Sequence, residues 1–258
     1  MTTFPAGTFT PAPGRGRTGR MLLTHARTEA SLTLRNSEQI LLTLLIPLAL
    51  LVGLTLLEIF SLPEPRIDSV TPRIFALAVM SSAFTGQAIA LGFDRRYGVV
   101  KRLAATALPR WLLLAGRTSA ALVVVLVQLV VLGVVAAVLG WSPSAAGIGW
   151  AVVLVLLGTV AFGALGVLLG GALKAEVVLA LANLVWFVLL LAGGIVVPAT
   201  SMPGVLADVV PFLPSGALAD GLHTALVDGA VPGWSVFVTL AGWGGVAAVL
   251  ATRTTKLS

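Results

Sequence analysis

Few side chains in this sequence of 258 residues could perform catalysis. It contains no cysteine, and its two histidines, His25 and His223, lie far apart. Asp220 and His223 are spaced to share one face of a helix, where they could form a metal-binding or proton-transfer pair. A local hydrogen bond or plain solvation explains the same spacing more simply. Because no nucleophile, acid–base or metal group forms a cluster, an intramembrane enzyme is disfavoured.

The charged residues also lack the patterns needed to use ATP or an ion gradient. A phosphate-binding loop ends in Gly-Lys-Ser/Thr, but Lys101, Lys174 and Lys256 each follow a residue other than glycine. Proton-coupled transport needs carboxylates at membrane depth, whereas Glu58 and Glu176 fall at the ends of apolar runs. Neither ATP hydrolysis by this chain nor ion-coupled transport therefore has chemical support.

One segment, residues 94–111, does concentrate charge. It reads Asp94-Arg95-Arg96-Tyr97-Gly98-Val99-Val100-Lys101-Arg102-Leu103-Ala104-Ala105-Thr106-Ala107-Leu108-Pro109-Arg110-Trp111. Apolar residues from Val99 to Ala107 recur at helical spacing beside Lys101 and Arg102, which predicts a short helix with one apolar and one basic face. Such a helix could dock in a groove of a soluble partner. A positively charged loop that only fixes membrane topology explains the same residues equally well.

The overall composition decides the environment in which these residues act. The chain is 58% hydrophobic and 10% charged, with a mean hydropathy of +1.05. Soluble domains are about 45–50% apolar and about 25% charged, so this chain lacks the polar residues that would cover a water-facing surface. It is predicted to be a membrane protein without an attached ATPase, kinase or nucleic-acid-binding domain, because no polar stretch is long enough for one.

Charge-poor runs of about 20 residues, the length that crosses a bilayer, predict an all-α membrane protein with six transmembrane helices. The expected spans cover about 40–60, 73–93, 111–139, 148–173, 177–197 and 229–252. Residues 198–228 contain four prolines and three aspartates, which leave only short apolar stretches. That segment is predicted to be a proline-rich, partly re-entrant outer hairpin that precedes the last span.

The basic residues predict the orientation of these spans. All but two of the 16 lysines and arginines fall on the side of the chain termini, and the exceptions are Arg66 and Arg73. Positive charge is retained on the cytoplasmic side, so both termini are predicted to be cytoplasmic. A seventh span through 209–228 would place Arg253 outside and is disfavoured. The net charge of +6 is thus a feature of the inner leaflet and does not indicate nucleic acid.

Two segments precede the spans. Residues 1–20 are rich in Pro, Gly, Thr and Arg, which predicts a disordered cytoplasmic lead and not a signal peptide. Residues 21–38 place apolar and basic side chains on opposite arcs of a helix. They predict an amphipathic interface helix along the inner membrane surface, with arginines near anionic headgroups. The alternative is a simple cytoplasmic extension of the first span.

The order of motifs resembles a known family. Residues 94–111 look like the coupling segment of the ABC-2 type permeases, the membrane subunits of ATP-binding-cassette exporters of the daunorubicin-resistance and polysaccharide/lipid export type. The surface helix that leads into Ile46-Pro47, and the proline-broken segment before the last span, are also similar to this family. The resemblance covers about residues 20–252. Ala107 departs from it, because a proline often follows the threonine there.

The resemblance implies the partners and the coupling residues. Two permease copies, expected to be a homodimer, would pair with two copies of a separate ABC ATPase chain in the inner membrane of a bacterial cell. This chain would hold no cofactor, and ATP and Mg would bind the ATPase. The ATPase-coupling residues would be Arg27, Arg35, Asp94, Arg95, Arg96, Tyr97, Gly98, Val100, Lys101, Leu103, Lys174 and Glu176.

The resemblance also places the substrate pathway between the second and fifth spans of two protomers. The candidate residues are Met80, Ser81, Phe84, Thr85, Gln87, Asn183, Trp186 and Phe187. Methionine and aromatic side chains suit adaptable contact with large substrates. Contacts between helices explain Ser81, Gln87 and Asn183 equally well. The expected function is ATP-driven export of an amphipathic drug or natural product; the alternatives are export of a lipid or lipid-linked glycan, or an ATP-independent channel or scramblase.

Overall fold

The computed structural model describes residues 17–35, 37–57, 62–105, 109–197 and 204–254, together with Pro5 and Met202. The side chains of residues 37–42, Ala104 and Arg110 lie outside this description. All regular elements in the described residues are helices, so the predicted all-α membrane fold is confirmed. The predicted disordered lead falls outside the described residues, apart from Pro5 and the stretch from Arg17.

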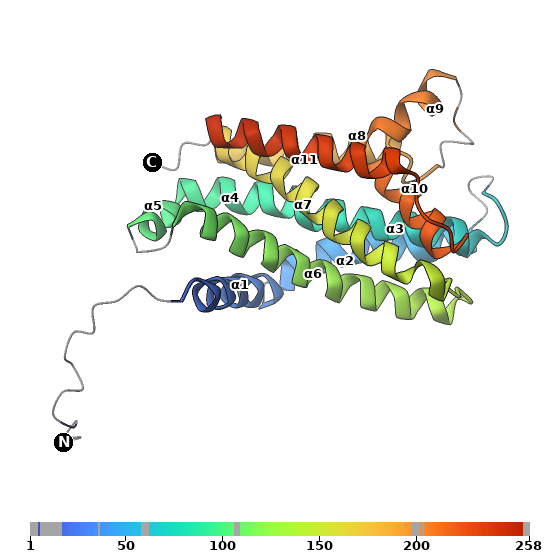
Figure 1. Cartoon of the computed structure of the whole chain (residues 1–258), viewed down its shortest axis with the longest axis horizontal. Helices are drawn as coiled ribbons and strands as arrows, with labels where there is room; N and C mark the ends of the chain where they lie inside the picture. Colours follow the sequence, from blue (N-terminus) through green and yellow to red (C-terminus); the bar gives the residue numbers. More distant parts are fainter. Residues whose placement is uncertain are drawn as a thin grey trace.

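Most of the helices run along one bundle (Figure 1). They are α1 (Thr18–Arg35), α2 (Ser37–Leu56), α3 (Arg66–Met80), the π-helix η1 (Ser81–Gly86), α4 (Gln87–Arg96), α5 (Val99–Ala104), α6 (Arg110–Val138), the 3-10 helix η2 (Ala145–Gly147), α7 (Ile148–Ala172), α8 (Ala175–Ala192), α9 (Val205–Val209), the 3-10 helix η4 (Val210–Phe212), α10 (Pro214–Leu226) and α11 (Trp234–Thr254).

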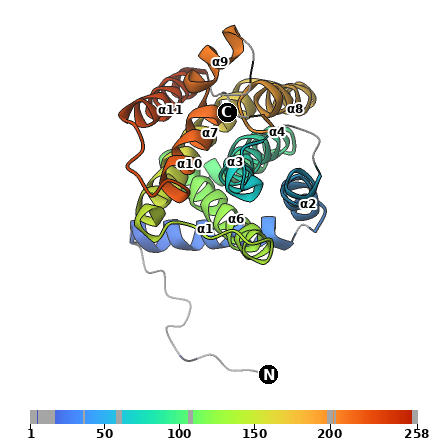
Figure 2. The same cartoon turned by 90° about the vertical axis from the view of Figure 1, so that its right-hand side faces the viewer.

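The first helix lies across the bundle. Figure 1 shows α1 nearly end-on beside α6, and the turned view in Figure 2 shows it running crosswise. Ala26 and Ala30 are buried on the face that packs against α6. The predicted boundaries, 21–38, are shifted: α1 starts at Thr18 and ends at Arg35, whereas Ser37 already belongs to α2. Serine favours the start of a helix, which suits the point where the chain turns into the bundle.

The second predicted span is longer than expected. A single helical run extends from Arg66 to Arg96, so it begins seven residues before position 73. Arg66 donates hydrogen bonds to the carbonyls of Leu54 and Leu57, which satisfies the free carbonyl groups at the end of α2. The side chain of Arg73, on α3, is buried in the bundle and donates to the Ser69 hydroxyl. Both arginines therefore belong to the packed bundle and not to an open loop.

Five helical runs in the described residues are long and apolar enough to cross a membrane. They are 66–96, 111–138, 145–172, 175–192 and 234–254. The first predicted span corresponds to α2. The part of α2 whose side chains are described, Thr43–Leu56, is apolar but shorter than the five runs above. The predicted re-entrant segment is a pair of helices, Val205–Phe212 and Pro214–Leu226, bent by 81°. Two further boundaries differ from the prediction. The fifth span ends at Ala192 and not at position 197, and the last helix begins at Trp234 and not at position 229.

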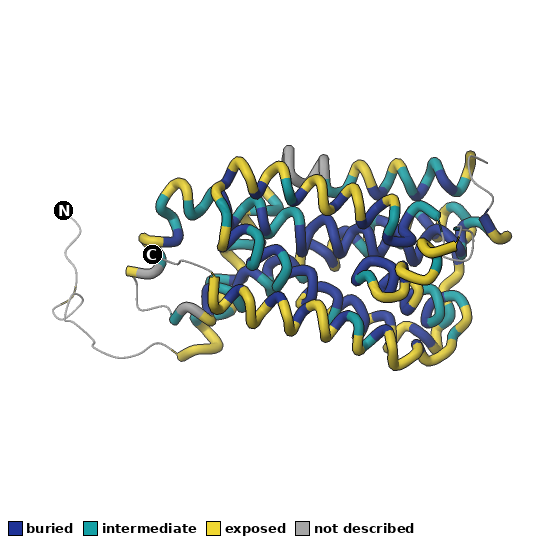
Figure 3. Tube along the Cα trace, turned by 90° about the horizontal axis from the view of Figure 1, so that it is seen from above, coloured by how far each residue is buried: buried dark blue, intermediate teal, exposed yellow. Residues whose placement is uncertain are grey.

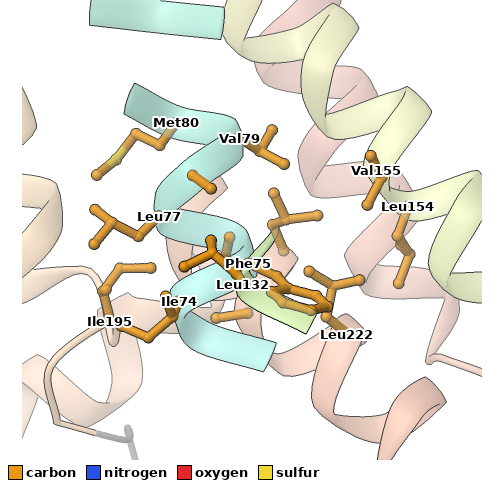
Figure 4. Packing of buried hydrophobic residues seen from close by; sticks show 14 of the residues in the cluster. Ile74, Phe75, Leu77, Val79, Met80, Leu132, Leu154, Val155, Ile195 and Leu222 are labelled. Atoms are coloured by element: carbon orange, nitrogen blue, oxygen red, sulfur yellow. The ribbon is translucent and has the colours of Figure 1, made fainter. Parts of the chain in front are cut away.

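The core surrounds α3. Side chains of α6, α7, α10 and the turn after α8 pack around Ile74, Phe75, Leu77 and Met80 (Figure 4). Buried residues follow the middle of the bundle, and exposed residues follow its outer faces (Figure 3). A helix that is buried on every side is the centre of a bundle. α3 and the start of η1 are thus the centre of the bundle, and α4 continues the same helical run toward a more exposed end.

Candidate functional site

The end of the bundle that carries α5 collects most of the predicted coupling residues. We call it the basic end, because Arg95, Arg96, Lys101, Arg102, Lys174 and Arg253 lie there. After α4 the chain turns at Gly98, whose φ of +70° is a conformation that residues with a side chain rarely adopt. The chain then forms α5 over Val99–Ala104, where the sequence predicts a short helix.

The two faces of this turn differ in what they contact. Val100 is 6% exposed and packs in a cluster with Leu91, Val167 and Ala251, so it holds α5 against α4, α7 and α11. Leu103 is half-buried. Tyr97 is 66% exposed, and Lys101 is exposed beside it. Among the predicted coupling residues, the aromatic ring and the ammonium group therefore face outward, whereas the valine packs inward.

Arg95 ties α4 to the end of α7. Its Nη1 donates to the carbonyl of Gly170 at 2.9 Å and to that of Leu173 at 3.1 Å. The last carbonyls of a helix lack partners within the helix and carry a partial negative charge, so a guanidinium group stabilises them. Arg95 is consequently an internal cap, and a movement of α4 at this end would also move α7.

The loop between α7 and α8 completes the basic end. Arg96 forms an exposed ion pair with Glu176 of α8. A cavity of about 470 Å³ opens between this loop and α5. Its lining includes six of the predicted coupling residues: Arg95, Arg96, Val100, Lys101, Lys174 and Glu176. Segments far apart in sequence thus form one basic, half-open surface, which we call the coupling surface.

Asp94 lies away from this surface. Its carboxylate pairs with the guanidinium of Arg117 on α6, whose side chain is 6% exposed. Arg27 and Arg35, the other two predicted coupling residues, are exposed on α1. That helix contacts α6 so closely that a side chain at Gly116 would overlap the ring of His25. The predicted coupling residues therefore occupy three places: the coupling surface, the outer face of α1, and the Asp94–Arg117 pair.

The predicted pathway residues of the second span meet at a π-helical turn. Residues Ser81–Gly86 form η1, in which each turn holds an extra residue; such turns are frequent at functional sites. Ser81 accepts a hydrogen bond from Trp186 Nε1 of α8 at 2.8 Å, and Ser82 donates to Gln128 Oε1 of α6 at 2.7 Å. Two polar bonds at membrane depth therefore fix η1 to neighbours on either side.

The other predicted pathway residues divide into buried and exposed groups. Met80 and Phe84 are buried within the chain, and Gln87 donates to the carbonyl of Arg117 at 2.7 Å. The Thr85 hydroxyl is buried and has no partner in the part of the chain that the structure describes. On α8, by contrast, Asn183 and Phe187 lie on the exposed face. A single chain therefore brings part of the predicted set together and leaves α8 open for a further contact.

Comparison with known proteins agrees with the resemblance predicted from the sequence. The sequence model of the family described as ABC-2 type transporter matches residues 21–225, from α1 almost to the end of α10. The chain belongs to the ABC-2 type transporter family. It is therefore a multi-pass membrane protein and an ABC transporter permease, a membrane transport subunit of the kind that generally partners with an ATPase subunit. None of the curated proteins matches the chain.

Sequence reasoning missed two residues of the permease that hold the site in place. Arg117 and Gln128 both lie in the long apolar run of the third span, and each bonds to the second-span helix. A polar residue inside such a run is a signal in itself, because it must face protein or a cavity. The sequence does not identify the partner. The sequence likewise suggests a different partner for His223 from the one in the structure. Its Nδ1 lies 3.7 Å from Asp228 Oδ2, and no bond to Asp220 is formed in the described residues.

The Asp94–Arg117 pair of the permease should be structural. We expect Asp94→Ala to destabilise the folded state by about 3 kcal/mol, because it leaves a buried guanidinium without its counter-ion. The double variant Asp94→Leu/Arg117→Met should recover most of that loss. Thermal unfolding of the detergent-purified permease measures both effects. Glu176→Ala is the matched control, since the exposed Arg96–Glu176 pair is worth less than about 1 kcal/mol. Equal losses in the two single variants would contradict the assignment.

Proposed function

We propose that this permease is the membrane subunit of an ATP-driven exporter, and that a separate ABC ATPase binds its coupling surface. The observation that carries the proposal is the exposure of Tyr97, in the turn before α5, and of Lys101 on α5, where Lys101 lines an open basic cavity. An exposed tyrosine suits a protein interface, where aromatic residues are enriched, and the lysine ammonium group beside it can attract an acidic partner surface. Two ATPase copies, which would hold ATP and Mg, would then serve two permease copies.

Charge supports a cytoplasmic position for this surface. The basic end carries lysines and arginines from four separate segments, and membrane proteins keep such residues on the cytoplasmic side. Orientation in the inner membrane of a bacterial cell, with the basic end inward, places the coupling surface where a soluble ATPase and its ATP are available. It also places the bent helix pair α9–α10 on the outer side.

The contacts around α5 give a route from ATP to the transport pathway. Val100 packs α5 against α4, α7 and α11, and Arg95 bonds α4 to the end of α7. When the two ATPases close on ATP, a push on α5 would act on α4 and α7 together. The next element along this central helix is η1, which bonds to α8 through Ser81 and Trp186. A displacement at the basic end would therefore reach the face of α8.

The exposed face of α8 is the proposed lining of the pathway and the contact with the second permease copy. Asn183 is a polar side chain at membrane depth, and Phe187 beside it is 54% exposed. Intramembrane polar residues ordinarily face protein or a cavity, so a second copy would complete this environment. An aromatic ring beside an amide group suits an amphipathic small molecule, and we assign a drug or natural product as the exported substrate.

Phe187 provides a test of this pathway. We expect Phe187→Ala to weaken the apparent affinity for an amphipathic substrate about tenfold, equivalent to about 1.4 kcal/mol, while the melting temperature stays unchanged. Transport of a fluorescent amphiphile into inverted membrane vesicles measures the affinity. Val130→Ala on α6 is the control, because Val130 is similarly exposed on an apolar face. A loss of affinity that is equal in the two variants would show that Phe187 has no place in the pathway.

The exporter assignment itself is tested by producing this chain together with a candidate ABC ATPase subunit. The two proteins should co-purify, and vesicles that contain both should accumulate the fluorescent amphiphile only with ATP and Mg. Accumulation of a lipid-linked glycan or lipid in place of the amphiphile would shift the assignment to lipid or glycan export. Movement of solute or lipid by this chain alone, without a complex, would support the channel or scramblase alternative and exclude the exporter.

A further inference from the structure

A second cavity of the permease lies away from the coupling surface and from α8. It is a groove of about 330 Å³ between α6 and α7. Its lining residues are Ala115, Thr118, Ser119 and Leu122 of α6 with Leu156, Thr159 and Val160 of α7. Figure 1 shows that α6 and α7 diverge toward the basic end. Val123 and Val153, on the two flanking helices, are exposed, so the groove opens toward the lipid.

Three hydroxyl groups in this groove lack the usual partner. Several threonines elsewhere in the helices donate to the carbonyl four residues earlier, as Thr28, Thr33, Thr71 and Thr254 do, whereas the Thr55 and Thr85 hydroxyls are buried without a partner in the described part of the chain. In the described part of the chain, the hydroxyls of Thr118 and Ser119 make no hydrogen bond, and the Thr159 hydroxyl is buried without one. Lipid tails offer no acceptor, and an unsatisfied hydroxyl in hydrocarbon is costly. A ligand with acceptor oxygens would remove this cost for Thr118 and Ser119, which are partly exposed.

The neighbouring helix α1 adds positive charge at one end of the groove. His25 of α1 contacts α6 at Gly116, next to the first groove residue, Ala115. The outer face of α1 carries Arg20, Arg27 and Arg35, and none of the three has an acidic partner among the described residues. Arginines on an interfacial helix attract anionic lipid headgroups. The groove therefore begins beside a cationic helix that crosses the bundle.

The depths of these groups match the parts of a phospholipid. Thr118 and Ser119 lie about 3–5 Å farther along α6 than Gly116, and Leu122 lies about 9 Å farther, at 1.5 Å per residue. If headgroups lie level with α1, ester carbonyls reach the two hydroxyls and an acyl chain extends past Leu122. On the α7 side, Gly163 lies beside Thr118, so Val160 is about level with Leu122 and Leu156 lies deeper; both are apolar. Phosphate, ester and chain thus each meet a suitable surface in the correct order.

We propose that the groove between α6 and α7 binds one anionic phospholipid from the leaflet at the basic end. Thr118 and Ser119 donate to its ester carbonyls, one acyl chain occupies the groove, and the arginines of α1 attract its phosphate. This lipid remains with the permease and is not its cargo. The site is independent of the exporter assignment, because it needs neither the ATPase nor the face of α8.

The full-length permease in nanodiscs tests this site with phosphatidylglycerol that carries a diazirine on one acyl chain. Illumination should crosslink the lipid to peptides of α6 and α7 that contain residues 115–122 and 156–160. We expect Thr118→Val/Ser119→Ala to reduce that crosslinking about tenfold, and Arg20→Gln/Arg27→Gln to reduce it severalfold. The control variant, Ser235→Ala/Thr239→Val on α11, removes two hydroxyls of the same types and should leave the crosslinking to α6 and α7 unchanged.

Several results would overturn the proposal. Unchanged crosslinking in the Thr118→Val/Ser119→Ala variant would show that the two hydroxyls do not bind the ester carbonyls. Equal labelling by phosphatidylcholine would show that the site does not require an anionic headgroup. Crosslinks confined to other helices would show that the groove is not the binding site. If the labelled lipid moves to the opposite leaflet when ATPase and ATP are added, the lipid is a substrate and not a resident ligand. A melting temperature equal to that of wild type shows that each variant is folded.

Discussion

Tyr97→Ala combined with Lys101→Glu is expected to reduce ATP-driven transport severely while the permease stays folded and inserted. Tyr97 and Lys101 are exposed on the coupling surface, so the change removes an aromatic contact and reverses a charge without opening the core. Buried interfacial aromatic residues contribute disproportionately to binding, and truncating one costs about 2 kcal/mol or more. The charge reversal adds repulsion against an acidic partner surface. Together these effects should reduce transport by at least about tenfold.

The measurement compares ATP hydrolysis and vesicle transport for the wild-type complex and the variant at equal amounts of inserted protein. The control, Phe212→Ala/Asp208→Lys, makes the same kinds of change at exposed residues of η4 and α9, at the other end of the bundle. We expect the control to retain transport and a normal melting temperature. Normal transport by Tyr97→Ala/Lys101→Glu, or an equal loss in the control, would show that the ATPase does not use this surface.

The features that could be predicted from the sequence are those that depend on hydropathy and helical periodicity. Apolar length locates five of the helical runs, because each needs about 20 residues to cross the hydrocarbon. Periodicity likewise predicts the crosswise helix before the spans, because its apolar and basic arcs need different surroundings. Proline spacing marks the bent helices of residues 205–226, since a segment so interrupted cannot continue as one straight helix. Each of these signals is local in the chain.

The rest depends on which neighbour each side chain meets. Periodicity places Val99 and Val100 on an apolar face, but only packing shows that Val100 binds the bundle and leaves Tyr97 outside. The Asp94–Arg117 pair joins two spans, and composition cannot choose such a partner. The π-helical turn at Ser81–Gly86 has no distinctive pattern of its own, because a single extra residue per turn hardly changes the hydropathy. Lipid and protein interiors are similarly apolar, so the sequence also cannot separate an inward from an outward face.

Gly170→Leu is expected to prevent the permease from folding stably. A Cβ atom at Gly170 would lie 2.5 Å from the carbonyl oxygen of Ala88 and 3.1 Å from Leu91 Cβ, so the backbone of α7 packs directly against the backbone of α4 there. Small residues permit such close approach between membrane helices. Overpacking costs about 1–3 kcal/mol in ordinary cores, and we expect the upper end or beyond, because backbone cannot rotate away. The Arg95 bond to the Gly170 carbonyl would be displaced as well.

Gly149→Leu, on the same helix, separates this packing effect from the change of residue type. A Cβ atom at Gly149 meets nothing within 4 Å, and replacing glycine in a helix should gain up to about 1 kcal/mol from propensity. Melting temperature and the yield of monodisperse protein should therefore fall for Gly170→Leu and hold or rise for Gly149→Leu. Ala88→Gly should fail to rescue Gly170→Leu, because the obstructing atom at Ala88 is a backbone oxygen that the truncation leaves in place. Rescue by that change, or equal stability of the two leucine variants, would mean that α4 and α7 can separate freely, and α5 could not then move them as one body.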